Sequence, residues 1–356
     1  MAVQLPDELI VEILSFLPAK SLLRCRLVCK SWLSLINSTK FKLMHLHNFN
    51  HLNPRYLVRS LDYCVSKECL DTIILWNPSI RRKLTLPMLH SVEFEESFAV
   101  LGFGYDKISD DYKVVRLNYV SNSFIRPQVE VYTVKTGIWR EVMFPDNLRC
   151  FYIYSDSSRV FSNGSVHWIA SDRTPGVSHY SILTFDISTE LFGEIQVPEF
   201  LAKEFLMVFT VGESLAVIHP CDLNFDGLKS GSTYLAMVMK EYKNPASWTM
   251  MYYMHYSELN LGKPLRLRNN GDMIVELENR DMVIFNHNEG YCVYAFRDGV
   301  EDKDFDCRTF VDRYQESLAL LDVGDSVPNN EAMEALMKVE KQGMMNLIHC
   351  LVDEMK

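Results

Sequence analysis

The chain has 356 residues, of which 48% are apolar, 12% aromatic and 23% charged, a composition that excludes a disordered or collagen-like chain. Its formal net charge of −10 argues against a nucleic-acid or anionic-membrane partner, because both need a basic face. No apolar run approaches a membrane-spanning helix and the nine cysteines are scattered, so we expect a reduced intracellular protein, in the cytoplasm or nucleus, without a membrane segment.

The first forty residues predict three short helices. Pro6, followed by Asp7 and Glu8, is typical of a helix start, because proline fits the first turn and carboxylates favour the helix N-terminus. Apolar residues recur at helical spacing up to Leu17, Pro18 breaks the pattern, and two further periodic segments follow. These helices carry more apolar side chains than one small bundle can bury. They either need a partner or open a larger helical domain.

The order and spacing of these residues resemble an F-box. The match runs through Leu5-Pro6-x-Glu8-Leu9, Ile13-Leu14-x-x-Leu17-Pro18 and Cys25-x-x-Val28-Cys29-Lys30-x-Trp32. The resemblance implies a docking module for the Skp-type adaptor of a cullin-based (SCF) ubiquitin ligase. Carried onto this chain, it places nine residues at the adaptor interface: Leu5, Pro6, Leu9, Ile13, Leu14, Leu17, Pro18, Leu22 and Val28.

Three other residues of this segment are expected to be core. Trp32 is predicted to anchor the third helix. Cys25 and Cys29 lie four residues apart on a predicted helix, but no further ligand stands at metal-binding spacing nearby. We therefore interpret both cysteines as small buried side chains.

Beyond residue 70 one pattern recurs five times: an apolar strand ends in a large residue, and a polar turn and a second strand follow. The first strands are 73–78, 129–133, 182–186, 235–239 and 282–286, at intervals of 46–56 residues. Hairpin signals precede the last four: Asp110-Asp111, Asn163-Gly164, Gly212-Glu213 and Asn270-Gly271. Four short strands in each ~50 residues predict a β-propeller-like domain, with an irregular β-sandwich as the alternative.

The same segments resemble the plant F-box-associated domain of type 1, which is kelch-repeat-like. The resemblance rests on Leu75-Trp76-Asn77-Pro78, Gly102-Phe103-Gly104-Tyr105-Asp106, Asp110-Asp111-Tyr112-Lys113, Asn163-Gly164-x-x-His167-Trp168 and Ser247-Trp248. The strand pair that usually precedes Trp-Asn-Pro in this family is missing, so we expect a short first blade. Tyr314-x-Glu316-Ser317-Leu318 resembles the terminal strand, and we expect it to pair with the first blade and close the ring.

The predicted fold is thus a small three-helix F-box followed by an all-β, propeller-like domain. We expect the F-box at 1–48, a linker or short first blade at 49–69, the β domain at 70–328 and a C-terminal helix at 329–356. The apolar stripe of that last helix, rich in methionine, fits packing on the propeller or binding to a partner.

The sequence predicts no chemistry of its own. We find no nucleophile elbow, paired metal histidines or phosphate loop, and we interpret Gly102-x-Gly104 as part of a blade turn and His167 as an ordinary blade residue. We therefore expect no catalytic residue, cofactor or metal. The resemblance implies a non-catalytic subunit that brings an unidentified protein target to the adaptor and, through it, to cullin. The alternative is an adaptor-bound or lectin-like binding protein outside a ligase.

Overall fold

The computed structural model divides into two compact units. It describes residues 6–52, 55–62, 73–87, 97–120, 125–154, 158–173, 179–221, 223–224, 227–228, 232–256, 261–277, 281–286, 288, 291–296 and 307–321. The helical unit comprises the described residues up to 87 together with 307–321, and the blade unit comprises those from 97 to 296. The predicted C-terminal helix at 329–356 lies outside the described residues.

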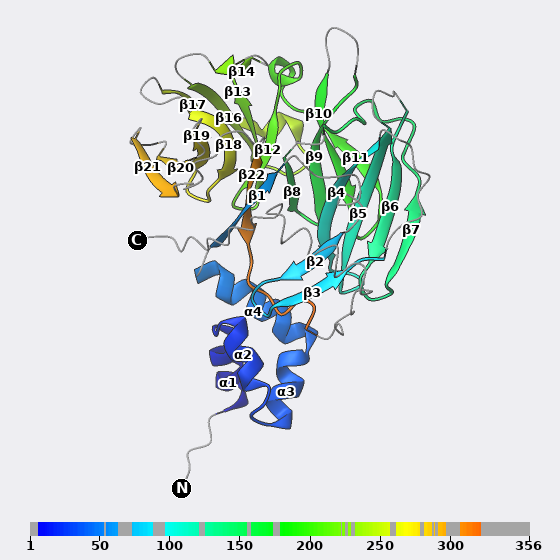
Figure 1. Cartoon of the computed structure of the whole chain (residues 1–356), viewed down its shortest axis with the longest axis vertical. Helices are drawn as coiled ribbons and strands as arrows, with labels where there is room; N and C mark the ends of the chain where they lie inside the picture. Colours follow the sequence, from blue (N-terminus) through cyan, green and yellow to red (C-terminus); the bar gives the residue numbers. More distant parts are fainter. Residues whose placement is uncertain are drawn as a thin grey trace. The chain divides into compact units, whose positions relative to one another are not determined.

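The helical unit begins with four helices (Figure 1): α1 (Asp7–Ser15), α2 (Ala19–Cys25), α3 (Lys30–Asn37) and α4 (Thr39–Leu52). The first three confirm the predicted helices. The fourth was not predicted, although its signal is present in the sequence: Phe41, His45 and Phe49 recur every four residues and are all buried. The His45 ring stacks between the two phenylalanine rings, with centroid distances of 6.4 and 5.5 Å.

Two small sheets complete the helical unit. Strand β1 (Arg55–Asp62) pairs antiparallel with β22 (Cys307–Tyr314), and β2 (Ile74–Asn77) forms a hairpin with β3 (Arg82–Thr85). The predicted terminal strand is therefore displaced towards the N-terminus: it ends at Tyr314. Glu316 and Leu318 lie beyond it, and both are buried within the helical unit. Glu316 accepts a hydrogen bond from the Ala19 N–H of α2, and Leu318 packs in the apolar cluster of the helical unit.

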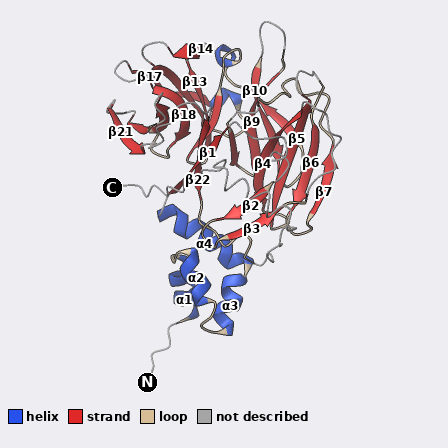
Figure 2. Cartoon of the chain, viewed as in Figure 1, coloured by secondary structure: helices blue, strands red, loops and turns tan. Residues whose placement is uncertain are grey.

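The blade unit contains four four-stranded antiparallel sheets, here called blades (Figures 1 and 2). The first has β4 (Ser97–Asp106), β5 (Asp111–Val120), β6 (Gln128–Thr133) and β7 (Ile138–Val142); the second has β8 (Arg159–Ser162), β9 (Ser165–Ser171), β10 (Tyr180–Asp186) and β11 (Phe192–Ile195). The third has β12 (Met207–Val211), β13 (Ser214–Pro220), β16 (Ser232–Met239) and β17 (Trp248–Tyr256). A separate short hairpin of β14 (Leu223–Asn224) and β15 (Gly227–Leu228) lies between β13 and β16 in the sequence. The fourth has β18 (Leu261–Leu267), β19 (Met273–Leu277), β20 (Met282–Asn286) and β21 (Tyr291–Phe296).

Register explains the repeated spacing of large residues. The second large residue of each repeat lies directly opposite the first across a hairpin: Trp139 pairs with Tyr132, and Phe192 pairs with Phe185. In the third blade the turn is longer, and Trp248 still pairs with Met239. All four predicted hairpin turns lie where expected, between the first two strands of each blade. The propeller-like prediction is confirmed at the level of these blades.

Adjacent blades are joined by buried side chains. One apolar cluster links the first and second blades, another the second and third, and a third the last two. Gly102 lies inside β4 rather than in a turn, which corrects the sequence-based interpretation. A Cβ atom on Gly102 would stand 2.6 Å from the buried Trp168 ring of the second blade, so glycine permits the close approach of the two blades.

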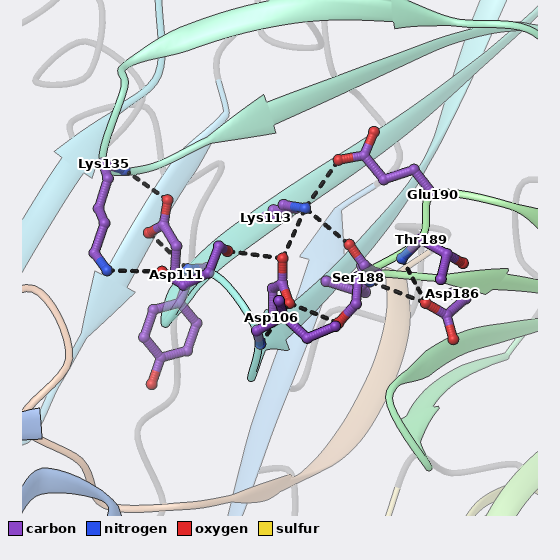
Figure 3. Close-up of polar contacts among 12 residues, drawn as sticks. Asp106, Asp111, Lys113, Lys135, Asp186, Ser188, Thr189 and Glu190 are labelled. Atoms are coloured by element: carbon purple, nitrogen blue, oxygen red, sulfur yellow. Dashed lines mark hydrogen bonds and ion pairs between the residues drawn. The ribbon is translucent and has the colours of Figure 1, made fainter. Parts of the chain in front are cut away.

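A buried polar network also joins the first two blades (Figure 3). The Lys113 ammonium lies 2.9 Å from carboxylate oxygens of Asp106 and Glu190, and it donates to the carbonyl oxygen of Ile187 at 2.9 Å. Ser188 of the second blade donates to Asp106 at 2.6 Å. Burial favours the protonated acid, but hydrogen bonds from Ser188 and Lys113 hold the pKa of the Asp106 carboxyl well below its usual range. Two residues of the family motifs, Asp106 and Lys113, therefore contribute to the packing of the first blade against the second.

Candidate partner-binding surface

The helices have an inner apolar face that forms the core of the helical unit. Leu14 of α1, Leu22 of α2 and Ile36 of α3 are almost completely buried. They pack in one cluster with Phe41 of α4 and with Leu318 from the far end of the chain. Side chains buried to this degree stabilise the unit and are not available to a second protein.

A second set of large apolar side chains on these helices is exposed to solvent. Leu27 is 87% exposed, Val28 65% and Ile13 54%. Those of the first three helices and their connections, here called the exposed apolar face, are Leu9, Ile13, Phe16, Leu27, Val28 and Leu33. These residues lie on α1 and directly after it, on the connection from α2 to α3 and on α3. Exposed apolar residues gathered on one small domain are typical of a protein-binding surface.

The predicted adaptor residues divide between these two faces. Leu9, Ile13 and Val28 belong to the exposed apolar face, and Pro6 and Pro18 are also exposed. Leu17 is partly buried, Leu14 and Leu22 are core, and Leu5 lies outside the described residues. Sequence reasoning did not select Phe16, Leu27 or Leu33. The spacing of Leu9, Ile13 and Phe16 carries the missing signal, because i, i+4 and i+7 define a second stripe on α1.

The structure corrects part of the expectation for the cysteines. Cys25 is partly buried in the core of the helical unit, whereas Cys29 is exposed at the start of α3. Trp32, in the first turn of α3, is partly buried and packs against the same core. Among the residues that the structure describes, no group of three His, Cys, Asp or Glu side chains could hold a metal ion.

Basic side chains accompany the exposed apolar face. Lys20, Arg24 and Lys30 are all exposed, on α2 and at the start of α3. An apolar face with basic neighbours is suited to a partner that combines an apolar groove with acidic residues, since complementary charge increases the association rate.

The most buried histidine of the blade unit has a structural environment. His167 on β9 is completely buried, and its Nε2 atom lies 3.0 Å from the hydroxyl of Tyr242 in the third blade. Burial lowers the pKa of His167 to about 4, so the ring is neutral near pH 7. This environment agrees with an ordinary blade residue. In the described part of the chain, no helix is long and apolar enough to span a bilayer.

Comparison with known proteins supplies the context for this surface. The profile of the F-box domain matches residues 3–44, and that of the F-box associated beta propeller domain matches residues 42–320. An F-box/kelch-repeat protein of Arabidopsis thaliana is 26% identical over 303 residues, covering 69% of this chain and 78% of the relative. The F-box protein CPR1 of Arabidopsis thaliana is 24% identical over 346 residues, covering 79% and 81%.

A solved structure with a similar architecture is the beta-propeller domain of the Trilobed protease from Pyrococcus furiosus. It superimposes with a TM-score of 0.33 at 8% identity, covering 64% of this chain and 77% of that domain. A second, YjhT, has a TM-score of 0.36 at 10% identity, covering 69% and 85%.

Proposed function

Because the chain belongs to the plant F-box proteins with an F-box associated β-propeller domain, we propose that it is the substrate-recognition subunit of an SCF ubiquitin ligase. In this proposal the helical unit docks on a Skp-type adaptor, which in turn binds cullin. The blade unit binds a protein target through its loops, since loops on a rigid scaffold are the usual recognition surface. The chain then contributes proximity and no bond chemistry.

The observation that carries the proposal is the exposed apolar face on the helices of the matched F-box. Burying Leu27 and Val28 on the adaptor removes from water the two most exposed large apolar side chains of the helical unit. The neighbouring Lys20 and Arg24 would assist association with an acidic adaptor surface. By holding a target beside the cullin-bound conjugating enzyme, the complex raises the effective concentration of the target's lysines.

A double substitution, Leu27→Asp with Val28→Asp, tests the adaptor assignment. Both side chains are exposed in the free chain, so the variant should fold normally. It should lose co-purification with the Skp-type adaptor, because docking would then bury two carboxylates without partners. The matched control is Ile138→Asp, which places the same charge at an exposed apolar position of the blade unit and should leave adaptor binding intact.

The same purification separates the ligase from its alternative. Cullin recovered with the adaptor supports the proposal, whereas an adaptor complex that never contains cullin favours a binding protein outside the ligase. Adaptor binding that survives the Leu27/Val28 double variant contradicts the assigned surface. Proximity labelling with proteasome inhibition then identifies the target, since ubiquitinated targets accumulate near the chain.

A further inference from the structure

The segment that joins α1 to the first residue of α2, residues 16–19, is here called the elbow. It is contacted by a residue 297 positions later in the chain. Pro18 precedes α2 at its N-cap position, and its side chain carries no oxygen that could accept from the first backbone N–H groups of the helix. The Ala19 N–H instead donates to Glu316 Oε1 at 2.5 Å, 297 residues further along the chain.

The Glu316 side chain is buried at this position. Glu316 is only 3% exposed and Ala19 is completely buried, so the hydrogen bond is shielded from water. A carboxylate at a helix N-terminus also interacts favourably with the helix dipole. On the other side of the elbow, His45 Nε2 lies 2.8 Å from the carbonyl oxygen of Leu17. Two side chains from outside α1 and α2 therefore satisfy the backbone of the elbow.

The segment that carries Glu316 is itself fixed within the helical unit. The Asn77 side-chain amide donates to the carbonyl oxygens of Ser317 and Ala319, at 2.9 Å each. Leu318 is 1% exposed and packs in the cluster that contains Leu14 and Leu22. Residues 316–321 thus form one packed structure with the F-box helices and the β2–β3 hairpin.

The elbow sets the geometry of the exposed apolar face. Phe16 is part of the elbow, and Ile13 lies one turn before it on α1. Leu27 and Val28 follow α2, so the direction in which α2 leaves the elbow decides where they stand relative to Ile13 and Phe16. Resting on the proposed function, we propose that Glu316 is a positioning residue for adaptor docking: it holds the elbow so that both parts of the exposed apolar face meet the adaptor together.

This arrangement makes docking depend on a residue that lies 297 positions after the helix residue it supports. A chain that lacks the segment around Glu316 leaves the Ala19 N–H without its acceptor and the core without Leu318. In such a chain the elbow becomes ordered only when the adaptor binds. The free-energy cost of that ordering weakens the affinity for the adaptor. The F-box of this protein is therefore complete only when residues 316–321 are in place.

The test compares Glu316→Ala, Glu316→Gln and Glu213→Ala in the full chain. Two quantities are measured: amide hydrogen exchange at residues 17–22 and the dissociation constant for the purified Skp-type adaptor. Glu316→Ala should accelerate exchange by about 10- to 100-fold, the range for a lost hydrogen bond to a charged group. It should weaken adaptor binding by about tenfold. Glu316→Gln keeps an accepting oxygen and should remain within about threefold of the wild type on both measures.

Glu213→Ala is the matched control, because Glu213 is exposed in the turn between β12 and β13 and its side chain is remote in sequence from the elbow. It should match the wild type. Exchange of the blade-unit strand β9 is measured in each variant and should not change. If exchange accelerates in Glu316→Ala while adaptor affinity does not change, the positioning role is wrong.

Equal losses in the Ala and Gln variants overturn the assigned hydrogen bond, as does a Glu316→Ala variant that matches the wild type in both measurements. A wild-type chain that does not bind the adaptor at all contradicts the proposed function instead. In that case the exchange measurement alone decides whether Glu316 holds the elbow: accelerated exchange in Glu316→Ala supports this part, and unchanged exchange overturns it.

Discussion

Replacing Lys113 by alanine should destabilise the blade unit strongly. The Lys113 side chain is 8% exposed and lies in the network between the first two blades (Figure 3). Its ammonium contacts Asp106, whose side chain is 3% exposed, and Glu190, whose side chain is 10% exposed. Removing the ammonium leaves two buried carboxylates without their shared counterion, which is among the most unfavourable changes that a single substitution can make.

The expected loss is about 3 kcal/mol of unfolding free energy. Breaking a buried ion pair by removing one partner costs about 3–5 kcal/mol. The lower end applies here, because Arg140 still pairs with Glu190, and Ser188 and Ser109 still donate to Asp106. A domain's total stability is about 5–15 kcal/mol, so the loss is easily measured.

Urea unfolding of the full chain, followed by circular dichroism and by hydrogen exchange in β5 and β9, provides the measurement. Lys135→Ala is the matched control. Lys135 also contacts an aspartate, Asp110 at 3.5 Å, but its side chain is 56% exposed, so the substitution should change stability by less than about 1 kcal/mol. If Lys113→Ala is no more destabilising than Lys135→Ala, the reasoning about the buried network is refuted.

Three further substitutions have expected outcomes. Gly102→Ala should destabilise the blade unit by about 1–3 kcal/mol in urea unfolding, because its Cβ would stand 2.6 Å from Trp168. A neutral effect would contradict the tight packing of the first two blades at Gly102. The depressed pKa of Asp106 contributes stability above the unfolded-state pKa of about 3.9, and this is lost as the pH falls through the folded-state value. Unfolding measured from about pH 5 to 2 should therefore show a weaker pH dependence in Asp106→Asn than in the wild type, and equal slopes would contradict this. Leu22→Ala should cost the helical unit about 2–5 kcal/mol, measured by exchange in α1–α3, while a loss confined to the blade unit would contradict its placement in the core.

The elements that sequence reasoning predicted best are those whose signals are local. Helical spacing and Pro18 located α1 and α2, and the turn residues Asn163-Gly164 located the β8–β9 hairpin. Tyr132 and Trp139 recur at a fixed interval because they face each other across a short hairpin. The fourth helix was missed because its buried stripe contains the polar His45, and the apolar Leu43 and Leu46 lie off that stripe, so no single apolar face stands out in the sequence.

The candidate site was predicted only in part, because both sides of α1 are apolar. A sequence shows that Ile13 and Leu14 are apolar, but not which of them faces the interior. Packing decides this: Leu14 is almost completely buried against the other helices, whereas Ile13 is 54% exposed. Packing likewise separates Leu22, which lies on α2 and is buried, from Leu27, which follows α2 and is 87% exposed.

The two kinds of structure in this chain, helical and β, and their order follow from local sequence patterns. Apolar period, turn residues and repeat interval are properties of neighbouring residues, and each can be read without knowing the fold. The long-range partners depend instead on the folded path of the chain. Glu316 contacts Ala19, and Lys113 contacts Glu190, because the path of the chain brings distant segments together. These contacts follow no local period, so only the folded chain reveals which buried charges and backbone groups they satisfy.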